Sequence, residues 1–385
     1  MKKRRIGRSP RRGAIVVLAA VLLVVFLALA AFAIDVGYIA LVRSELQNVA
    51  DSAALAGAAE LVNRDQLKNA YNTDSIRAVA RENALAYASM NSAGGKPILV
   101  EPNNTNLPTG DLVVGFLSNP SDPASSMTTN TSALNAVRVV ARRSASQNGS
   151  SPLFFARALG RETFDVTAEA TAVIDTNITG FTAPQAGQKS KLLPFAMHVD
   201  QWLSLLSGNG NDVWSVNPST GTVTSGSDGI RETQLYGNQK QGAGSFGTVN
   251  IGPQNNGAGD IRRQILEGPS ASDFASHGGK IELNSQGKLL LSGDPGLTAG
   301  FRSQLEAIRG QPRAIPLYES ISGSGGASTY TIVGFAGITI TEVKLTGPTK
   351  RVMIQPEIVR DRTAISRNVT PVAPQFIYRP VRLAR

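Results

Sequence analysis

The hydrophobic pattern of the chain opens with one long apolar stretch. Residues 14–34 carry no charged and no strongly polar side chain. At a rise of about 1.5 Å per residue, a helix of this length spans about 30 Å, which matches the hydrocarbon core of a bilayer. The pattern therefore predicts a transmembrane helix at 14–34.

A helical period continues beyond this stretch. Val42, Leu46, Val49, Ala53 and Ala56 recur every three or four positions within residues 35–62. Because alanine is the best helix former, we expect a post-membrane helix here that is continuous with the membrane span. Small side chains allow close approach, so this helix is expected to pack on its own domain, to form an assembly surface between copies or partners, or both.

Shorter periods follow after residue 62. A helix is expected from Thr73 to the Gly94-Gly95 pair, and a second, short one at 152–160. Strands are expected at 98–100, 112–117, 136–141 and 164–174. These elements predict an α+β domain at 63–175, and the aperiodic residues 176–190 predict a linker.

Residues 191–385 are expected to form a β-rich domain. Segments rich in glycine and asparagine predict long loops at 207–229 and 237–260. Helices are expected at 260–266 and 298–309, and strands at 288–291, 330–336, 337–346 and 351–358. The fold class is thus α+β: a single N-terminal transmembrane helix that continues into a long helix, then an α+β domain and a β-rich domain.

Positive charge gathers on one side of the apolar stretch. The residues concerned are Lys2, Lys3, Arg4, Arg5, Arg8, Arg11 and Arg12. Because such residues stay in the cytoplasm, they predict a cytoplasmic tail at 1–13 and an extracytoplasmic location for everything after residue 35. These seven cations carry most of the net charge of +10, so the charge reports topology and predicts no nucleic-acid partner.

The apolar stretch also has features of a cleaved signal. Ala31-Phe32-Ala33 resembles a signal-peptidase site, and Gly13 stands where a prepilin leader would be cut. The apolar run is longer than the usual 7–15 residues of a signal peptide, however, and Leu18 stands where prepilins carry Glu. We favour a retained anchor, with release after Ala33 as the alternative.

Residue types that carry catalysis are scarce. The absence of cysteine excludes a zinc thiolate site, a Cys nucleophile and a redox role. Neither histidine, His198 or His277, stands in a recognisable catalytic setting, so both are expected to be surface or structural residues. We predict no catalytic residue, cofactor or metal, and a protein that is not an enzyme.

Two short motifs resemble known ligand-binding sequences. Residues 242–247 match G-x-G-x-x-G, but a strand-like run follows where a dinucleotide site needs a helix, so a glycine loop is expected. Residues 209–212 offer oxygen ligands for calcium but lack the spacing and final Glu of an EF-hand, so a turn is expected.

Asp35 ends the apolar stretch, with Arg43 about two turns later on the same face. An ionised carboxylate here either marks the membrane interface or forms a salt bridge to a basic residue of a partner. Both interpretations stay open.

Charged and small residues of this region fall at fixed spacings. They are an Arg-Gly before the apolar helix, an Asp-x-Gly after it, an Arg-x-x-Leu-Gln and an Ala-Asp-x-Ala-Ala-Leu-Ala-Gly. The residues are Arg12, Gly13, Asp35, Gly37, Arg43, Leu46, Gln47, Ala50, Asp51, Ala53, Ala54, Leu55, Ala56 and Gly57. This segment resembles the N-terminal membrane-anchor module of the Tad/Flp pilus-assembly TadE/TadG-like family.

The resemblance implies a structural or accessory component of a Tad/Flp-type pilus or secretion apparatus. Such a protein is anchored in the bacterial inner membrane, with its C-terminal domains periplasmic or at the cell surface. Its implied partners are the membrane, other pilus-assembly or secretion proteins, and further copies through the N-terminal helix. The Asp-x-Ser-x-Ser metal motif of some relatives is missing, so no metal-dependent adhesion site is carried over. The alternatives are a secreted adhesive protein released after Ala33 and a signal-anchored hydrolase.

Overall fold

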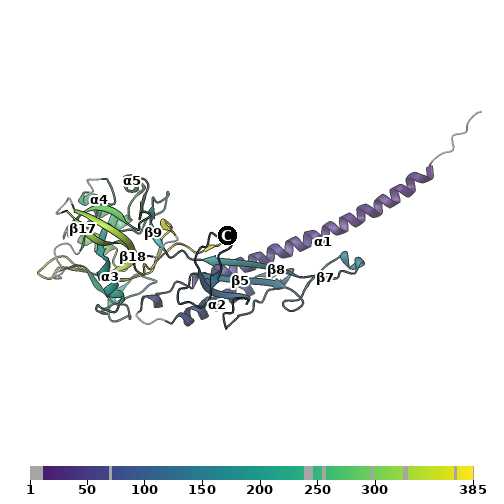
Figure 1. The fold of residues 1–385 in the computed structure, drawn as a ribbon, viewed down its shortest axis with the longest axis horizontal. Coiled ribbons are helices and arrows are strands. Elements are labelled where there is room, and N and C mark those ends of the chain that lie inside the picture. Colours follow the sequence, from purple (N-terminus) through teal and green to yellow (C-terminus); the bar gives the residue numbers. More distant parts are fainter. Residues whose placement is uncertain are drawn as a thin grey trace, which may run out of the picture. The chain divides into compact units, whose positions relative to one another are not determined.

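The computed structural model describes residues 12–68, 72–237, 246–253, 257–295, 299–323, 328–367 and 371–384. The fold is α+β, with one long N-terminal helix and a β-rich C-terminal region (Figure 1). The chain divides into two compact units. Unit 1 comprises residues up to 56, 81–113 and 138–171, and unit 2 comprises 57–80, 114–137 and 172–385. Each unit thus draws on three separate segments, whereas the sequence pattern suggested consecutive domains at 63–175 and 191–385.

Helix α1 runs unbroken from Arg12 to Ala59, as the continuous helical period predicted (Figure 1). Its first half exposes large apolar side chains from Ile15 to Ile34. By length and composition, this part of α1 is able to cross a membrane. Its second half buries one face within the protein. Asp35 follows the exposed apolar stretch directly; beyond it Val36 and Leu41 are still exposed, and Val42 is the first fully buried apolar residue of α1.

Three longer strands follow α1 in the first half of the chain. They are β3 (Leu112–Leu117), β5 (Ala136–Arg143) and β8 (Val166–Val173), close to their predicted positions. With β4 (Met127–Thr128) and β23 (Arg382–Leu383) they form a five-stranded sheet in the order β23-β8-β5-β3-β4. Their apolar residues are buried on at least one face, which fits the short β-branched runs in the sequence.

Helix α2 (Thr73–Ser89) is shorter than predicted. Gly94 and Gly95, expected to end it, instead form the turn between β1 (Ser92–Ala93) and β2 (Lys96–Pro97). Both glycines have positive φ, which a tight hairpin turn requires.

Two further expectations for this region are wrong. Residues 98–100 form no strand, because the Leu99 backbone bonds to the Asn148 side chain and not to a neighbouring strand. The helix expected at 152–160 is a single turn, η2 (Ala156–Leu159). Flanking it, β6 (Ser151–Pro152) pairs with β7 (Thr163–Phe164). A loop closed by a strand pair has no room for a longer helix.

Unit 2 is built on a seven-stranded sheet in the order β13-β19-β18-β16-β14-β10-β17, in which β17 also pairs with β18. The second pairing closes β18, β16, β14, β10 and β17 into a ring, and β19 and β13 extend it. The strands are β10 (Phe195–His198), β13 (Thr233–Gly237), β14 (Phe246–Val249), β16 (Leu289–Pro295), β17 (Arg313–Ser322), β18 (Ser328–Lys344) and β19 (Arg351–Pro356).

The 17-residue strand β18 makes this closure possible. It was predicted as two strands that meet at Gly337, but it is continuous. A Cβ at Gly337 would lie 2.4 Å from the Glu357 carbonyl oxygen, so glycine serves close strand packing here rather than a break. Along one edge β18 pairs with β16 and then β19, and along the other with β17.

Apolar residues on successive positions of these strands enter two different cores. Phe195 and Met197 belong to one cluster and Ala196 to the other. The described residues after 172 form the helices α3 (Val199–Leu206), α4 (Ala258–Glu267), α5 (Ala271–Ala275) and α6 (Arg302–Ala307), the last preceded by η3 (Ala299–Phe301). Helices α4 and α6 were predicted, whereas α3 and α5 were not. Thr298, the first residue of the predicted helix at 298–309, lies outside the described residues.

Segments predicted as unstructured contain strands. Within the predicted linker, β9 (Ile178–Thr182) is the middle strand of a sheet with β15 (Lys280–Glu282) and β21 (Ala364–Ser366). Four of its five residues are buried, so this segment is part of the core of unit 2 and not a linker. Likewise β11 (Trp214–Val216) pairs with β12 (Val223–Ser225) inside a predicted loop, and β20 (Val359–Arg360) pairs with β22 (Ile377–Tyr378).

Candidate functional site

Asp35 holds a loop of unit 1 against α1. Its Oδ1 accepts a hydrogen bond from the Phe154 N–H at 2.8 Å, and its Oδ2 accepts bonds from the N–H groups of Phe155 at 3.1 Å and Ala156 at 2.7 Å. These donors begin η2, where backbone N–H groups lack partners within the helix. The side chain of Asp35 is therefore a cap supplied from a distant part of the chain, and the residue is 3 % exposed.

The same contacts keep Asp35 ionised. Burial raises the pKa of the Asp35 carboxyl. The hydrogen bonds from the three backbone N–H groups together lower the pKa by more than burial raises it, so it lies below its usual 3.8. The sequence singled out Asp35 but not its partner, because 119 residues separate it from Phe154. The helical turn that starts at Ala156 has no capping side chain of its own, and this was the one feature that indicated a cap from elsewhere in the chain.

Further polar contacts tie the second half of α1 to unit 1. Gln47 Nε2 donates to Asp51 Oδ1 at 2.8 Å and to the Glu169 carbonyl on β8 at 3.0 Å. Glu45 Oε2 accepts from the Gly94 N–H in the β1–β2 turn at 2.7 Å. Gln47 and Asp51 thus serve the fold of unit 1, with Asp51 acting through Gln47.

Arg143 is a fully buried cation that the sequence did not single out. Its Nη1 donates to the Ala93 carbonyl and its Nε to the Gly149 carbonyl, both at 3.0 Å. Gly94 leaves room for it, since a Cβ there would lie 2.6 Å from Arg143 Nη1. Backbone carbonyls therefore hold this guanidinium.

The small residues of the family pattern divide between a buried and an exposed face. Leu46, Ala50, Ala53 and Ala54 are fully buried within the chain. Of the two roles expected for the post-membrane helix, packing on its own domain therefore describes these positions, and an assembly surface does not. Gly57 is also buried, Leu55 and Ala56 are partly buried, and Gly37 and Arg43 are exposed.

The exposed face of α1 carries its own series of small residues. Ala30, Ala33, Gly37, Ala40 and Ser44 alternate spacings of three and four, which places them on one stripe of the helix. A Cβ at Gly37 would meet nothing within 4 Å. Of the basic tail, residues 2–11 lie outside the described part of the chain, and Arg12 and Gly13 begin α1.

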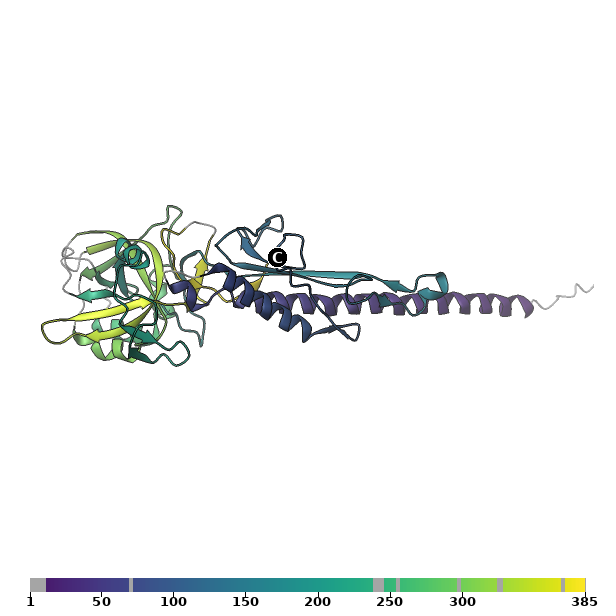
Figure 2. The ribbon, with the colours of Figure 1, turned by 90° about the horizontal axis from the view of Figure 1, so that it is seen from below.

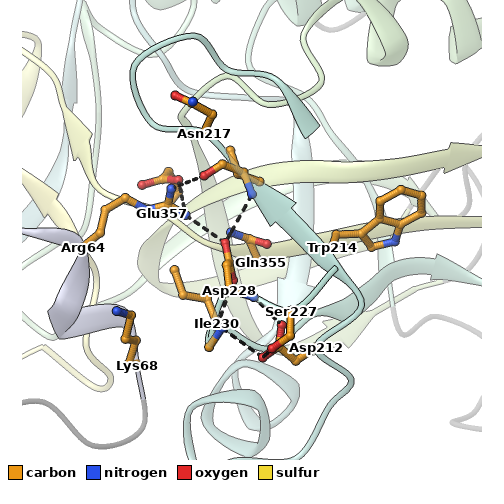
Figure 3. Close-up of polar contacts among 12 residues, drawn as sticks. Arg64, Lys68, Asp212, Trp214, Asn217, Ser227, Asp228, Ile230, Gln355 and Glu357 are labelled. Carbon is orange, nitrogen blue, oxygen red and sulfur yellow. Dashed lines mark hydrogen bonds and ion pairs between the residues drawn. The ribbon is translucent and has the colours of Figure 1, made fainter. Parts of the chain in front are cut away.

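In unit 2, Arg64 connects the segment after α1 to the β-rich core. It lies in η1 (Arg64–Leu67), and its Nη2 is 3.3 Å from Glu357 Oε2 and 3.5 Å from Asp228 Oδ2. Figure 3 shows Arg64 directed toward both carboxylates. Asp228 also accepts hydrogen bonds from the Gln355 side chain and the Val216 N–H. This ion-pair cluster fixes η1 to the end of β19.

The acidic groups of this region differ in their electrostatics. Burial raises the pKa of Glu357 above its usual 4.5, and the ion pair with Arg64 offsets only part of this. Burial also raises the pKa of Glu232, although the N–H groups of Val213 and Trp214 donate to it. Such shifts are found at catalytic sites, but hydrogen-bonded structural carboxylates show them as well.

Asp212, the candidate calcium ligand, braces a turn. Its carboxylate accepts hydrogen bonds from the Ser227 hydroxyl at 2.6 Å and from the N–H groups of Asp228 and Gly229, both at 3.0 Å (Figure 3). Among the described residues, no group of three His, Asp or Glu side chains converges in a way that would hold a metal ion. The turn expected at 209–212 accounts for these contacts.

The two histidines have structural surroundings. His198 caps α3, where its Nδ1 accepts from the Asp200 N–H at 3.2 Å, and its ring packs edge-on against Tyr318. His277 is partly buried, which lowers its pKa below 6.5. Of the glycine motif, residues 242–245 lie outside the described part, and the following residues form β14.

A pocket of about 390 Å³ opens on unit 2. Leu61, Ile76, Phe116 and Phe376 supply much of its apolar lining, and Lys68 is the charged residue among the described residues around it. The described lining contains hydroxyl groups, such as those of Ser132 and Tyr378, but no Asp, Glu or His side chain that would serve as a general base beside them.

Comparison with known families agrees with the sequence pattern. Residues 13–60 match the family model of putative Flp pilus-assembly TadE/G-like proteins, and residues 56–172 match that of putative Tad-like Flp pilus-assembly proteins. The resemblance predicted from the residues around α1 is thus confirmed and extends to residue 172. No match to the chain was found among curated proteins or among solved structures.

Proposed function

We propose, from the match of residues 13–60 to TadE/G-like and of residues 56–172 to Tad-like Flp pilus-assembly proteins, that this chain is a structural component of a Tad/Flp-type pilus or secretion apparatus. It acts without catalysis, as an anchored building block or accessory protein. The observation that carries the proposal is α1, a single helix that joins an exposed apolar half to a half packed within the family module.

The apolar half anchors the protein in the bacterial inner membrane. The N-terminal cations hold the tail at 1–13 in the cytoplasm, so that residues 35–385 lie on the periplasmic side or at the cell surface. Retention of the anchor is supported by the continuity of α1 through Ala31 and Ala33, with no break at the candidate cleavage site.

Protease treatment of intact spheroplasts tests this topology. We expect the C-terminal portion to be digested and a short membrane-bound fragment to survive, because the protease reaches only the outer side. Survival of the whole 40.5 kDa chain until lysis would contradict the proposed topology. A mature protein that begins at Ile34 and leaves the membrane would support the secreted alternative instead.

Assembly then uses the face of α1 that the chain itself leaves uncovered. Ala53 and Gly57 lie on the buried face, so bulky residues there would disturb the fold before they disturbed any partner. The exposed small residues, among them Gly37 and Ala40, allow a second helix to approach closely. The partner is another pilus-assembly protein or a further copy of the chain.

Paired substitutions test this surface. Gly37→Leu and Ala40→Leu should reduce pilus number and the co-purification of partners from membranes, while membrane insertion and thermal unfolding stay unchanged. Gly37→Ala and Ala40→Ser are the matched controls, because they keep the side chains small. Normal assembly by the leucine variants would exclude lateral packing through this face.

A broad screen against peptide, glycan and ester substrates tests the hydrolase alternative. We expect no turnover by the full chain, because the two carboxylates with raised pKa values, Glu232 and Glu357, are held by backbone N–H groups and by Arg64. Turnover that is lost on substitution of a residue lining the unit 2 pocket would overturn the non-catalytic proposal.

A further inference from the structure

The loop that Asp35 caps is unusual in what it exposes. Residues 153–162 are closed by the β6–β7 pair and by a hydrogen bond from the Leu153 N–H to the Glu162 carbonyl at 2.8 Å. Within this loop Phe154 is 55 % exposed, Phe155 47 % and Leu159 84 %. Single exposed apolar residues are common on soluble proteins, but three large ones within six positions form a local apolar surface.

The loop is held beside α1 at Asp35, just after the apolar stretch of the helix. Its backbone is bonded to Asp35, the first charged residue after the apolar stretch, and Figure 2 shows the teal hairpin alongside the purple helix. Aromatic contacts reinforce this placement, since the Tyr38 ring lies 5.1 Å from the Phe154 ring and 6.2 Å from the Phe164 ring. Both sets of contacts are within unit 1.

We propose that loop 153–162 is a second membrane contact, in which Phe154, Phe155 and Leu159 enter the outer interface of the phospholipid bilayer that α1 spans. The inference rests on the proposed membrane anchoring of α1. A lipid surface is the chosen occupant because the loop is bonded to Asp35, which directly follows the exposed apolar stretch of α1 from Ile15 to Ile34.

The chemistry of the loop suits this interface. Amphipathic segments that lie in the plane of the headgroup boundary bury Phe and Leu side chains there and carry Lys or Arg on their polar side. Arg157 and Arg161 are exposed on the same loop, and their long stems allow the guanidinium groups to reach lipid phosphates. Asp35 satisfies the first N–H groups of η2, which removes the cost of carrying free donors into an apolar environment.

The consequence is a membrane contact at two points. A single helix in a bilayer has its depth set by its apolar length and flanking charges, but it is free to rotate about its axis. A loop fixed to one side of that helix and embedded at the interface restricts this rotation for unit 1. It therefore selects which face of α1 is turned toward neighbouring proteins.

The absence of cysteine makes a direct test simple. Leu159→Cys is labelled with an environment-sensitive fluorophore, and the full chain is reconstituted in vesicles of phosphatidylethanolamine and phosphatidylglycerol that contain spin-labelled quencher lipids. Leu107→Cys, on another exposed loop of unit 1, is the aqueous control. Leu29→Cys, in the exposed apolar half of α1, is the membrane control.

We expect lipid quenching at position 159 to exceed that at position 107 by at least about threefold, as for a side chain placed in the interface. Equal quenching at 159 and 107, with strong quenching at 29, would overturn the loop contact and leave the anchor intact. Weak quenching at 29 would instead contradict the proposed anchoring, and with it the inference.

Two further measurements separate lipid from protein contact. A fluorescence shift at position 159 that grows with protein density, without lipid quenching, would identify a second copy as the occupant and overturn the proposal. Asp35→Asn should lower the quenching at 159 and leave that at 29 unchanged, since this residue positions the loop and does not itself insert. Unchanged quenching at 159 in this variant would contradict its positioning role.

Discussion

At the scale of single residues, several charged side chains in this protein satisfy backbone groups of distant segments. Asp35 accepts hydrogen bonds from three successive N–H groups, Asp212 braces a turn, and Arg143 donates to carbonyls in two loops. Each contact joins parts of the chain that no helical or strand register would bring together. Their removal is therefore expected to loosen one loop at a time.

Asp35→Asn tests the best-defined of these contacts. We expect amide hydrogen exchange at Phe154–Ala156 to become at least about tenfold faster, because a neutral amide oxygen is a weaker acceptor than a carboxylate. Glu162→Gln, a change of the same kind at an exposed residue of this loop, is the control and should leave exchange unchanged. Equal exchange in both variants would exclude Asp35 as the cap.

The cap also has a defined pH dependence. Because the pKa of Asp35 is lowered in the folded protein, its stabilising contribution is present above the ordinary value of 3.8. It is lost as the pH falls through the lower folded-state pKa. Protection of the loop should therefore be constant at neutral pH and fail only in strong acid.

Arg64→Met tests the ion-pair cluster of unit 2. We expect a loss of about 2–4 kcal/mol in unfolding free energy at pH 7, because the nearly buried carboxylates of Asp228 and Glu357 lose their cation. Lys68→Met is the control, since the Lys68–Asp65 pair is exposed and should contribute less than about 1 kcal/mol. Denaturation of the full chain in detergent gives both values.

The loss caused by Arg64→Met should shrink in acid. Burial raises the pKa of Glu357 above 4.5, so its favourable contribution is present below pH 4.5 and is lost as the pH rises through the folded-state pKa. Arg64 offsets this loss at neutral pH and has less to offset once Glu357 is protonated. A destabilisation that is the same at pH 4 and pH 7 would contradict this assignment.

At the scale of elements, tertiary contacts decide where helices and strands end. The Gly94-Gly95 pair predicted the end of a helix, but it forms the turn of the β1–β2 hairpin. The Gly94 N–H in this turn donates a hydrogen bond to Glu45 of α1. Pro152 predicted the start of a helix, but it lies in strand β6, which pairs with β7. In both cases a partner from another segment supplies the hydrogen bond that fixes the element.

Alanine substitutions at the two glycines separate backbone strain from lost space. Gly94→Ala should lower stability by about 2–4 kcal/mol, because its φ is +58° and the new Cβ would displace Arg143. Gly95→Ala shares a positive φ of +72° but meets no atom within 4 Å, so we expect about 1 kcal/mol. Thermal unfolding of the two variants in detergent measures the difference, and equal values would exclude the Arg143 contact as the cause.

At the scale of the whole molecule, the proposed membrane orientation rests on charge and hydrophobicity. Neutralising the seven basic residues before the apolar stretch should let part of the population insert with the opposite orientation, because these cations determine the cytoplasmic side. Protease accessibility of a C-terminal tag measures the fraction. Neutralising seven exposed arginines and lysines of unit 2 is the control, and inversion by this control alone would contradict the prediction.

The sequence by itself determined the features that depend on local chemistry and on one-dimensional periodicity. The continuous helix α1 was predicted because its apolar and alanine-rich residues favour a helix wherever they lie. The strands at 112–117, 136–141 and 164–174 were predicted from short β-branched runs, and the family from charged and small residues at fixed spacing.

Only the tertiary structure decided the contacts between distant segments. The pairing of β10 with β17, the burial of β9 and the capping of η2 by Asp35 each join residues far apart in the chain. Such contacts form because buried backbone groups must find partners, and the sequence does not record which segment supplies them. Asp35 therefore stood out in the sequence, while its role depended on a loop more than 100 residues away.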